Sequence, residues 1–259
     1  MTGKGAVKTT ASLKEMCPDW ESIVDSLKKW RKDLQKAKTA GIHSASAESA
    51  KSIDPSVSTI AEQYKKDPRL SSIEMPWAVL VSTILSLRTK DEVTLRCSRA
   101  LLAKAPTPAK MFALDEETIA ALAYPAGFYR TKAANLRKIA AILLDTYGGV
   151  VPDDLDTLLE LPGVGRKTAN LVITEAYNKY GICVDIHVHR ISNRTGWLSS
   201  RNPEETEMIL RKILPRKFWK TINPLLVLYG QNVCRPISPF CSRCVIAPHC
   251  RSLNVETSR

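Results

Sequence analysis

Apolar residues recur at helical spacing along most of the chain, and glycine or proline breaks separate one run from the next. Three such runs each predict a helix ended by Gly or Pro: DEETIAALAYPAG, RTKAANLRKIAAILLDTYGG and VPDDLDTLLELPG. Alternating strand patterns are scarce, and ICVDIHVH at 182–189 is the best strand candidate. The mostly apolar segment at 75–89, MPWAVLVSTILSLRT, permits a buried strand, but its length favours a core helix. The sequence therefore predicts a mainly α fold.

The N-terminal part of the chain carries one separate helical pattern. Its apolar members are Trp20, Ile23, Val24, Leu27, Trp30 and Leu34. Residues 42–58 are rich in Ser and Ala and predict a linker, although their Ala/Glu/Lys part could instead continue the helix. The first 16 residues hold no apolar stretch that could serve as a secretion signal, and no apolar run reaches the roughly 20 residues that span a bilayer. We therefore expect a soluble, intracellular protein with no membrane partner.

The chain is basic, with 38 Lys and Arg against 26 Asp and Glu, a formal net charge of +12. Excess positive charge favours polyanions through phosphate contacts and counterion release. The segment RKILPRKFWK at 211–220 mixes five cations with two aromatic residues. It indicates either a nucleic-acid contact or a solvated helix face.

Four of the seven cysteines crowd near the end of the chain in the pattern C-x6-C-x2-C-x5-C. In a chain without a secretion signal this distribution indicates a metal site rather than a disulfide framework. Four thiolates suit either a zinc ion or an iron–sulfur cluster, but zinc ribbons usually offer two C-x2-C pairs and this chain has one. The candidate ligands are Cys234, Cys241, Cys244 and Cys250, whereas Cys17, Cys97 and Cys183 are expected to be small buried residues.

The stretch LPGVGRKTANLV at 161–172 raises the question of phosphate binding. A nucleotide-binding P-loop needs Gly before its lysine, and Arg166 stands there instead, so that interpretation fails. What remains is a helix, a tight Pro-Gly-Val-Gly turn and a second helix that begins at about Arg166. Gly163 and Gly165 allow backbone geometry closed to other residues, and the turn's amides can then face an anion. The turn either holds a DNA phosphate without reading sequence or simply connects two helices.

LPGVGRKTAN followed by VDIHVHRISNR resembles the helix-hairpin-helix and Asp loop of the endonuclease III family of DNA glycosylases. Lys167 and Asp185 are 18 positions apart, which matches the spacing of that family's catalytic pair. The cysteine spacing is similar to the 4Fe–4S loop that these relatives carry after the hairpin. The resemblance covers residues 60–255, approximately, and implies a 4Fe–4S cofactor.

The resemblance also implies two helical lobes with a DNA cleft between them. A six-helix barrel with the helix-hairpin-helix would occupy 69–179, and a helical iron–sulfur cluster domain would combine 59–68 with 180–259. Residues 1–58 would form an N-terminal extension with one amphipathic helix and a linker. The implied partner is double-stranded DNA with a damaged base or an abasic site, bound by a monomer. Such a protein would be located with the DNA, in the cytoplasm or nucleoid of a prokaryote.

The family's chemistry assigns Lys167 as the nucleophile that forms a Schiff base with the sugar of a flipped nucleotide. The amine must be neutral to attack, a state that burial beside cations such as Arg166 would favour. Asp185 would accept a proton from it and stabilise an oxocarbenium-like sugar. Outside this context the two residues would be a solvated charge and a helix cap. The hairpin positions implied to bind DNA are Leu161, Gly163, Val164, Gly165 and Arg166.

Five further positions follow from the same resemblance. Ser86 and Asp91 match an active-site Ser and Asp that organise water and protons, or else they form a helix end and an N-cap. Arg88 stands where the family often has a glutamine that fills the gap left by a flipped base; related sequences with a Gln-Arg pair would make Leu87 the departure instead. Phe128 matches a second intercalating position or is a core aromatic residue. The remaining one, His187, matches a common histidine of the Asp loop or is a structural histidine.

The resemblance predicts a bifunctional DNA glycosylase and abasic-site lyase that removes oxidised pyrimidines such as thymine glycol. Lys167 separates it from adenine-specific and thymine-mismatch relatives, which typically lack this lysine. Two alternatives stay open, a non-catalytic damage-binding module and an enzyme that acts on abasic sites only. Within the cysteine loop, Arg235 and Arg243 could contact DNA or offset the charge of an anionic cluster.

Overall fold

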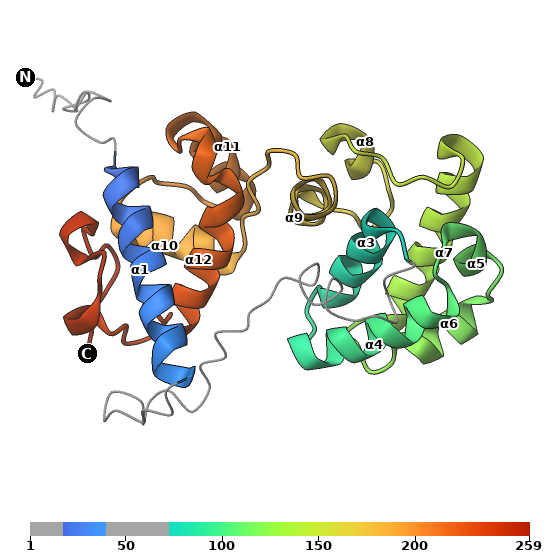
Figure 1. Ribbon diagram of the computed structural model, residues 1–259, viewed down its shortest axis with the longest axis horizontal. Coiled ribbons are helices and arrows are strands. Elements are labelled where there is room, and N and C mark those ends of the chain that lie inside the picture. The colour runs from blue at the N-terminus through green and yellow to red at the C-terminus, as the bar shows by residue number, and fades with distance from the viewer. Residues whose placement is uncertain (1–17, 40–72) are drawn as a thin grey trace, which may run out of the picture. The chain divides into compact units, whose positions relative to one another are not determined.

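The computed structural model describes residues 18–39 and 73–259, and the regular structure in these ranges is helical, without a strand (Figure 1). The predicted linker, the first 16 residues and Cys17 lie outside the described residues. The chain divides into two compact units. The hairpin unit comprises Asp54–Asp185 and Trp219–Pro224, and the cysteine unit comprises Met1–Ile53, Ile186–Phe218 and Leu225–Arg259. None of the described helices combines the length and the apolar character that a membrane span requires.

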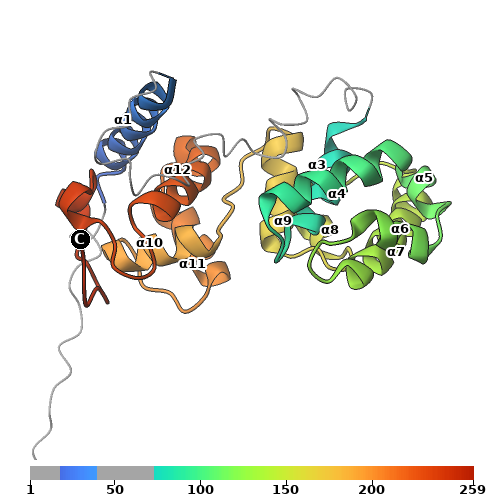
Figure 2. The same ribbon diagram turned by 90° about the horizontal axis from the view of Figure 1, so that it is seen from below.

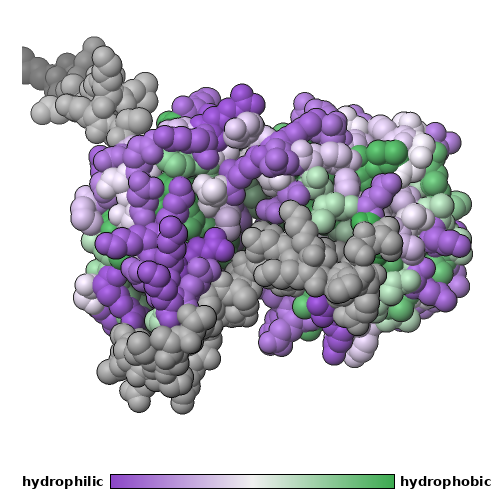
Figure 3. Space-filling model, viewed as in Figure 1, coloured by the Kyte–Doolittle hydropathy of each residue, from purple (hydrophilic) through white to green (hydrophobic). Residues whose placement is uncertain are grey.

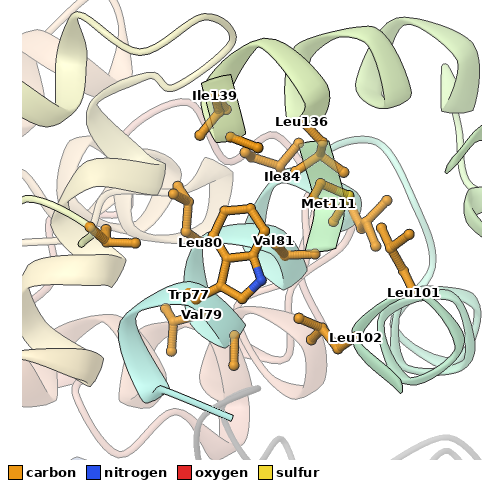
Figure 4. Close-up of a cluster of buried hydrophobic side chains, with 14 of the residues drawn as sticks. Trp77, Val79, Leu80, Val81, Ile84, Leu101, Leu102, Met111, Leu136 and Ile139 are labelled. Carbon is orange, nitrogen blue, oxygen red and sulfur yellow. The ribbon is translucent and has the colours of Figure 1, made fainter. Parts of the chain in front are cut away.

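The hairpin unit is built around one buried helix, α3. The elements of the unit are α3 (Met75–Ser86), α4 (Asp91–Lys104), α5 (Pro108–Phe112), α6 (Glu116–Ala123), α7 (Tyr129–Tyr147), α8 (Leu155–Leu159), α9 (Arg166–Leu171) and the π-helix η4 (Val172–Ala176). Every residue of α3 from Trp77 to Leu85 is buried, and α4, α7, α9 and η4 pack against it. Figure 4 shows Trp77 among Leu80, Val81 and Val79, and its Nε1 donates to the Ala105 carbonyl over 3.2 Å. The predicted core helix is confirmed.

The ends of the other predicted helices follow the signals in the sequence. Side chains of Asp115 and Asp154 accept the N-terminal amides of α6 and α8, over 2.6 and 3.0 Å. These bonds satisfy amides that have no partner within the helix. At the other end of α7, Gly148 adopts φ +60°, the left-handed C-cap conformation that glycine favours. All three helices predicted from Gly and Pro breaks are confirmed.

The cysteine unit is helical, and one of its helices begins inside the segment that was predicted to be a strand. Its elements are α1 (Trp20–Thr39), α10 (Ile186–Thr195), α11 (Pro203–Ile213), η5 (Arg216–Phe218), most of α12 (Trp219–Asn232), η6 (Cys241–Arg243) and η7 (Ala247–His249). The strand predicted at 182–189 is wrong. Three neighbours, Ile182, Cys183 and Val184, are all buried, so their side chains do not alternate. From Ile186 onward the chain is helical, because the apolar residues that α10 buries recur at helical spacing.

The helix that the spacing of apolar residues predicted near the N-terminus is α1, and it belongs to the cysteine unit (Figures 1 and 2). Trp20 packs edge-on against Trp197 with ring centroids 5.1 Å apart, and Trp30 packs against Tyr229 of α12 at 4.9 Å. The outward surface over α1 is largely hydrophilic in Figure 3, as expected for an amphipathic helix with its apolar face buried. Part of the N-terminal extension therefore belongs to the core around the cysteines.

Candidate active site and metal centre

The hairpin connects α8 to α9, and its two glycines serve different needs. Gly163 has φ +77°, which L side chains rarely adopt, and a Cβ there would lie 2.5 Å from Nδ2 of Asn135. Gly165, the N-cap of α9, has φ −95°, a value open to any residue. Apart from its chain neighbours, a Cβ at Gly165 would meet no described atom within 4 Å. Special backbone geometry is therefore required at Gly163, whereas the same prediction for Gly165 is wrong: its lack of a side chain leaves open space in front of the turn.

The apolar members of the hairpin hold it to the core. Leu161 and Val164 are buried, with only 2% and 6% of their surface exposed. Their side chains are therefore unavailable to a ligand, and only backbone groups of these two residues can face one. Arg166, half-buried, begins α9 as predicted.

The chain segment that ends at Asp185 lies alongside α9. A Cβ at Gly181 would lie 2.7 Å from Oδ1 of Asn170, and Sγ of Cys183 lies 4.0 Å from the carbonyl oxygen of Lys167. From Gly181 to Cys183 the segment thus runs back along α9, from Asn170 near its C-terminal end to the carbonyl of Lys167 in its first turn. Both residues of the predicted catalytic pair lie in the hairpin unit.

Lys167 is exposed in the first turn of α9. The burial that was expected to favour its neutral form is therefore not supplied by the described chain itself. Directly after this short helix the backbone widens into the π-helix η4, where the Thr174 hydroxyl donates to the Asn170 carbonyl over 2.8 Å. Single π-helical turns occur frequently at functional sites.

Ser86 and Asp91 lie on either side of the loop between α3 and α4. Ser86 ends α3 and donates its hydroxyl to the Thr83 carbonyl over 2.7 Å, which is a helix-end role. Asp91 is exposed and is the first residue of α4, where a carboxylate complements the positive end of the helix. The N-cap of α4 is Lys90, so the alternative that Asp91 is the N-cap is wrong.

Arg88 and Phe128, the two predicted gap-filling positions, come from different loops and lie together. The guanidinium carbon of Arg88 is 5.4 Å from the centroid of the Phe128 ring. Both side chains are exposed, Phe128 by 62%, which excludes the alternative of a core aromatic residue. Both residues also have left-handed backbones, with φ +53° and +57°, which only a few per cent of non-glycine residues adopt.

His187 lies in the first turn of α10, in the cysteine unit, and has a partner within that unit. Its Nδ1 lies 3.1 Å from NH2 of Arg190, which also donates to the carbonyls of Gly230 and Cys234 over 3.1 and 2.9 Å. Through Arg190, His187 is tied to the segment that leads into the cysteine loop. This contact fits the structural interpretation of the histidine.

The four clustered cysteines are free thiols, each half-buried. Burial raises the pKa of Cys234 and of Cys244. The charge of Cys250 raises both pKa values as well, so these three sulfurs share one region. Zinc–sulfur bonds of about 2.3 Å would draw four sulfurs to about 3.8 Å from one another. Among the residues that the structure describes, no three His, Cys, Asp or Glu side chains are gathered closely enough to hold one metal ion. Four thiolate ligands suit either a zinc ion or an iron–sulfur cluster.

Hydrogen-bond donors from outside the cysteine loop point at these sulfurs. NH1 of Arg194 lies 3.4 Å from Sγ of Cys234, and the hydroxyl of Tyr229 lies 3.1 Å from Sγ of Cys244. The backbone amide of Ser252 donates to Sγ of Cys250 over 3.3 Å. Donors of this kind stabilise thiolate ligands and tune iron–sulfur clusters.

Sequence reasoning missed Arg194 and Tyr229. Arg194 is buried in α10 and also donates to the carbonyls of Arg235 and Pro236, over 2.6 and 2.9 Å, so it holds the loop as well as the sulfur. Burial raises the pKa of Tyr229 and keeps it a donor. Neither residue lies in a local pattern that distinguishes it from an ordinary helix residue.

The two arginines within the cysteine loop both contact one aromatic ring. Arg235 and Arg243 flank the ring of Phe240, with guanidinium carbons 5.2 and 3.8 Å from its centroid, and Arg259 lies at 4.5 Å. They thus assemble the end of the chain around one aromatic residue. The guanidinium that donates to a cysteine sulfur is that of Arg194.

The basic segment 211–220 is neither one helix face nor a set of free cations. It crosses the end of α11, the turn η5 and the start of α12. Arg211 pairs with Glu207 over 2.8 Å, Lys217 pairs with Glu21, and Phe218 is buried. Ion pairs within the protein therefore neutralise part of the positive charge that the composition suggested for binding a polyanion.

Residues 81–216 match the model of the HhH-GPD superfamily of base excision DNA repair proteins. The chain is 45% identical over 189 residues to endonuclease III of Thermotoga maritima, covering 73% of this chain and 89% of that protein. It is 44% identical to the chloroplastic endonuclease III homolog 1 of Arabidopsis thaliana over 73% of this chain, and spans 52% of that relative's length. The chain belongs to the endonuclease III family. It is accordingly a DNA glycosylase of base excision repair.

Solved structures agree with this assignment. A trapped endonuclease III–DNA covalent intermediate has a TM-score of 0.65 and 33% identity, with 74% of this chain and 93% of that chain covered. A thermostable thymine-DNA glycosylase shares the fold with a TM-score of 0.64 at 24% identity, over 75% of this chain and 93% of that one. The helical fold implied by the family resemblance is confirmed.

Substitution by Ala should have a large effect on the free energy of unfolding at Gly163 and a small one at Gly165. Gly163→Ala should lower the free energy of unfolding by about 1–2 kcal/mol, the cost of a left-handed backbone at a residue with a Cβ. Gly165→Ala should change it by only a few tenths of a kcal/mol, because the weaker N-cap that Ala makes is offset by the lower conformational entropy of the unfolded chain. Urea unfolding of both variants measures this difference. Equal losses would contradict the separate roles.

Proposed function

We propose that the chain is a bifunctional DNA glycosylase and abasic-site lyase that removes oxidised pyrimidines, such as thymine glycol, from double-stranded DNA. The observation that carries the proposal is the course of the chain beside α9: Cys183, two residues before Asp185, contacts the carbonyl oxygen of the exposed Lys167. On these neighbouring segments Lys167 would supply the nucleophile and Asp185 the carboxylate. The enzyme would act as a monomer and be located with the DNA.

Lys167 would attack C1′ of a flipped nucleotide with its neutral amine, and the damaged base would leave with the electrons of the glycosidic bond. Asp185 would take up the proton that the amine loses and stabilise the positive charge that develops on the sugar. Because Lys167 is exposed in the chain alone, the bound nucleotide itself must supply the desolvation that favours the neutral amine.

Ring opening then yields a protonated Schiff base between Lys167 and C1′. This iminium makes the C2′ proton acidic, and its removal expels the 3′ phosphate, so that the strand breaks 3′ to the lesion by β-elimination. Water finally hydrolyses the Schiff base and releases the amine. Ser86 and Asp91, on either side of the loop after α3, would organise water and protons for these steps.

The hairpin would bind a phosphate of the DNA backbone. The amides of the turn and the N-terminus of α9 provide donors without a side chain in front of them, because Gly165 leaves the approach open. Arg166 would add positive charge at the same end, and His187 would contribute to DNA contact from the first turn of α10. Arg88 and Phe128 would occupy the gap left by the flipped base.

The four cysteines would hold a 4Fe–4S cluster. Their donor set suits it: four thiols stand at a spacing that resembles the family's 4Fe–4S loop, and Arg194, Tyr229 and the Ser252 amide direct hydrogen bonds at three of the sulfurs. When bound, such a cluster supplies structural or electronic function rather than hydrolysis, since four cysteine ligands leave no position for a substrate. Domain boundaries at 69–179 for the barrel and at 180–259, with 59–68, for the cluster domain remain part of this proposal.

Two alternatives differ from this function in their substrates. A damage-binding module would bind modified DNA and leave it intact, and an enzyme for abasic sites would act only after another glycosylase. The presence of Lys167 and Asp185 on neighbouring segments favours catalysis over binding alone.

Borohydride trapping on duplex DNA with a single thymine glycol tests the mechanism. We expect a covalent adduct with the wild-type chain and none with Lys167→Gln, while Lys179→Gln, a control lysine paired with Asp153, should still form it. An adduct with a preformed abasic site alone would show the lyase but contradict the proposed substrate. No adduct on either DNA would favour the binding module.

Gly165→Ala also tests the phosphate contact. A Cβ there would project into the open approach to the turn, so the affinity for duplex DNA should fall about tenfold while the unfolding curve stays unchanged. Fluorescence anisotropy at fixed salt measures the affinity. Unaltered binding by this stable variant would argue that the turn is only a helix connector.

Iron and sulfide analysis tests the cluster. The purified chain should contain four iron atoms and show the broad visible absorbance of an iron–sulfur protein, and Cys241→Ser should lose both. Cys97→Ala, which removes a buried thiol in the hairpin unit, should keep the iron. Zinc instead of iron in protein prepared with both metals available would overturn the assignment.

A further inference from the structure

One buried cation in the hairpin unit has no part in the chemistry described so far. Lys132, in the first turns of α7, is only 6% exposed. Its ammonium donates to the carbonyls of Leu85 and Leu87 over 2.7 and 2.6 Å and to Oγ1 of Thr89 over 3.0 Å. These three bonds use all three protons of the ammonium group. A charged group so deeply buried is costly unless each of its donors is used, so this arrangement is specific.

Thr89 extends the network from one loop to the other. Its Oγ1 accepts the backbone amide of Gly127 over 3.1 Å, and its hydroxyl lies 3.2 Å from the Leu87 carbonyl. The loops are so close that a Cβ at Gly127 would lie 2.4 Å from the carbonyl oxygen of Arg88. Lys132 and Thr89 therefore connect the loop after α3 to the loop before α7 at their point of closest approach.

The residues held by this network are the two with strained backbones. Arg88 follows Leu87, whose carbonyl accepts from Lys132, and Phe128 follows Gly127, whose amide donates to Thr89. Each of the pair has a left-handed φ that its own side chain disfavours. Such conformations persist only where surrounding interactions fix them, and the network lies one residue away from each.

We propose that Lys132 and Thr89 form a clamp that positions Arg88 and Phe128, and that this clamp determines how the enzyme engages the base opposite the lesion. The inference rests on the proposed function, in which Arg88 and Phe128 fill the gap left by a flipped base. Lys132 and Thr89 are positioning residues, because they act through the backbones of the two loops and contact no DNA themselves.

The charge of Lys132 gives the clamp a pH signature. Burial lowers the pKa of Lys132 to about 8, and the Cys97 thiol of α4 acts in the opposite direction; α3 and the loop after it present only neutral acceptors to the amine. Above this pH a neutral amine has two protons for three acceptors, so the clamp loosens. Global stability should change in the opposite sense. Between pH 8 and 10.5 the unfolded chain binds more protons than the folded one, so stability rises with pH.

The test compares Thr89→Val, which removes the hydroxyl but keeps the shape, with Thr89→Ser, which keeps the hydroxyl. Lys132→Met removes the charge, and Lys138→Met is its control on the exposed face of α7. Excision is measured on the same lesion in duplex and in single-stranded DNA, where there is no opposite base and no gap. Each of Thr89→Val and Lys132→Met removes three hydrogen bonds of the network. We expect both to lower kcat/KM about tenfold on the duplex, with little change on the single strand. The two controls should match the wild type, whose duplex-to-single-strand ratio should fall as the pH rises through about 8.

Amide hydrogen exchange of residues 85–90 and 124–128 provides a readout that needs no activity. Exchange should accelerate in Thr89→Val and Lys132→Met and not in their controls. If Lys132→Met does not fold, Thr89→Val decides. Equal losses on both DNAs, or wild-type exchange in Thr89→Val, would overturn the clamp. If the wild type excises neither DNA, the proposed function fails, while the exchange data still decide whether the clamp exists.

Discussion

The complete burial of α3 is the constraint on which the rest of the hairpin unit depends. Since no face of this helix is free, α4, α7, α9 and η4 must all lie against it. Three parts of the candidate site are thereby fixed: Arg88 follows the end of α3, Phe128 precedes α7, and Lys167 lies in the first turn of α9. A close-packed interior does not deform continuously, so these loops keep their positions relative to one another. The site is thus a consequence of how one apolar helix is covered.

Much of this fold was predictable because its signals are local. The apolar residues of α3 and the Gly and Pro breaks after α6, α7 and α8 act within a few residues of where they stand, and the helices they predict are confirmed. The prediction of a strand at 182–189 is wrong because it too rested on a local signal. Its alternating pattern is local, but the burial of Ile182 to Val184 on successive positions comes from α9 and the rest of the unit. Gly165 likewise resembles Gly163 in sequence, and only their φ values separate them.

The candidate site likewise contains some residues that local sequence patterns predict and others that only tertiary contacts define. The hairpin, the pair Lys167 and Asp185 and the four cysteines have characteristic spacings, so sequence alone could single them out. The residues that support them have no characteristic spacing. Lys132 looks like any surface lysine of an amphipathic helix, yet its partners lie 45 and 47 positions earlier in the chain. Arg194 reaches a sulfur 40 positions away and Tyr229 one 15 positions away. Such roles depend on tertiary contacts that no local pattern encodes.

The strengths of these contacts indicate which part of the site moves when DNA binds. Two left-handed residues cost about 1–2 kcal/mol each, whereas hydrogen bonds to a charged group contribute about 1.5–3 kcal/mol each. The three bonds of Lys132 can therefore offset both strained backbones together with part of the cost of burying the charge. By contrast, an exposed cation–π contact such as that of Arg88 with Phe128 is worth about 0.5–1 kcal/mol. In the proposed function the weak contact between the side chains would give way first, so that Arg88 and Phe128 would separate within the gap while the backbones that carry them stay in place.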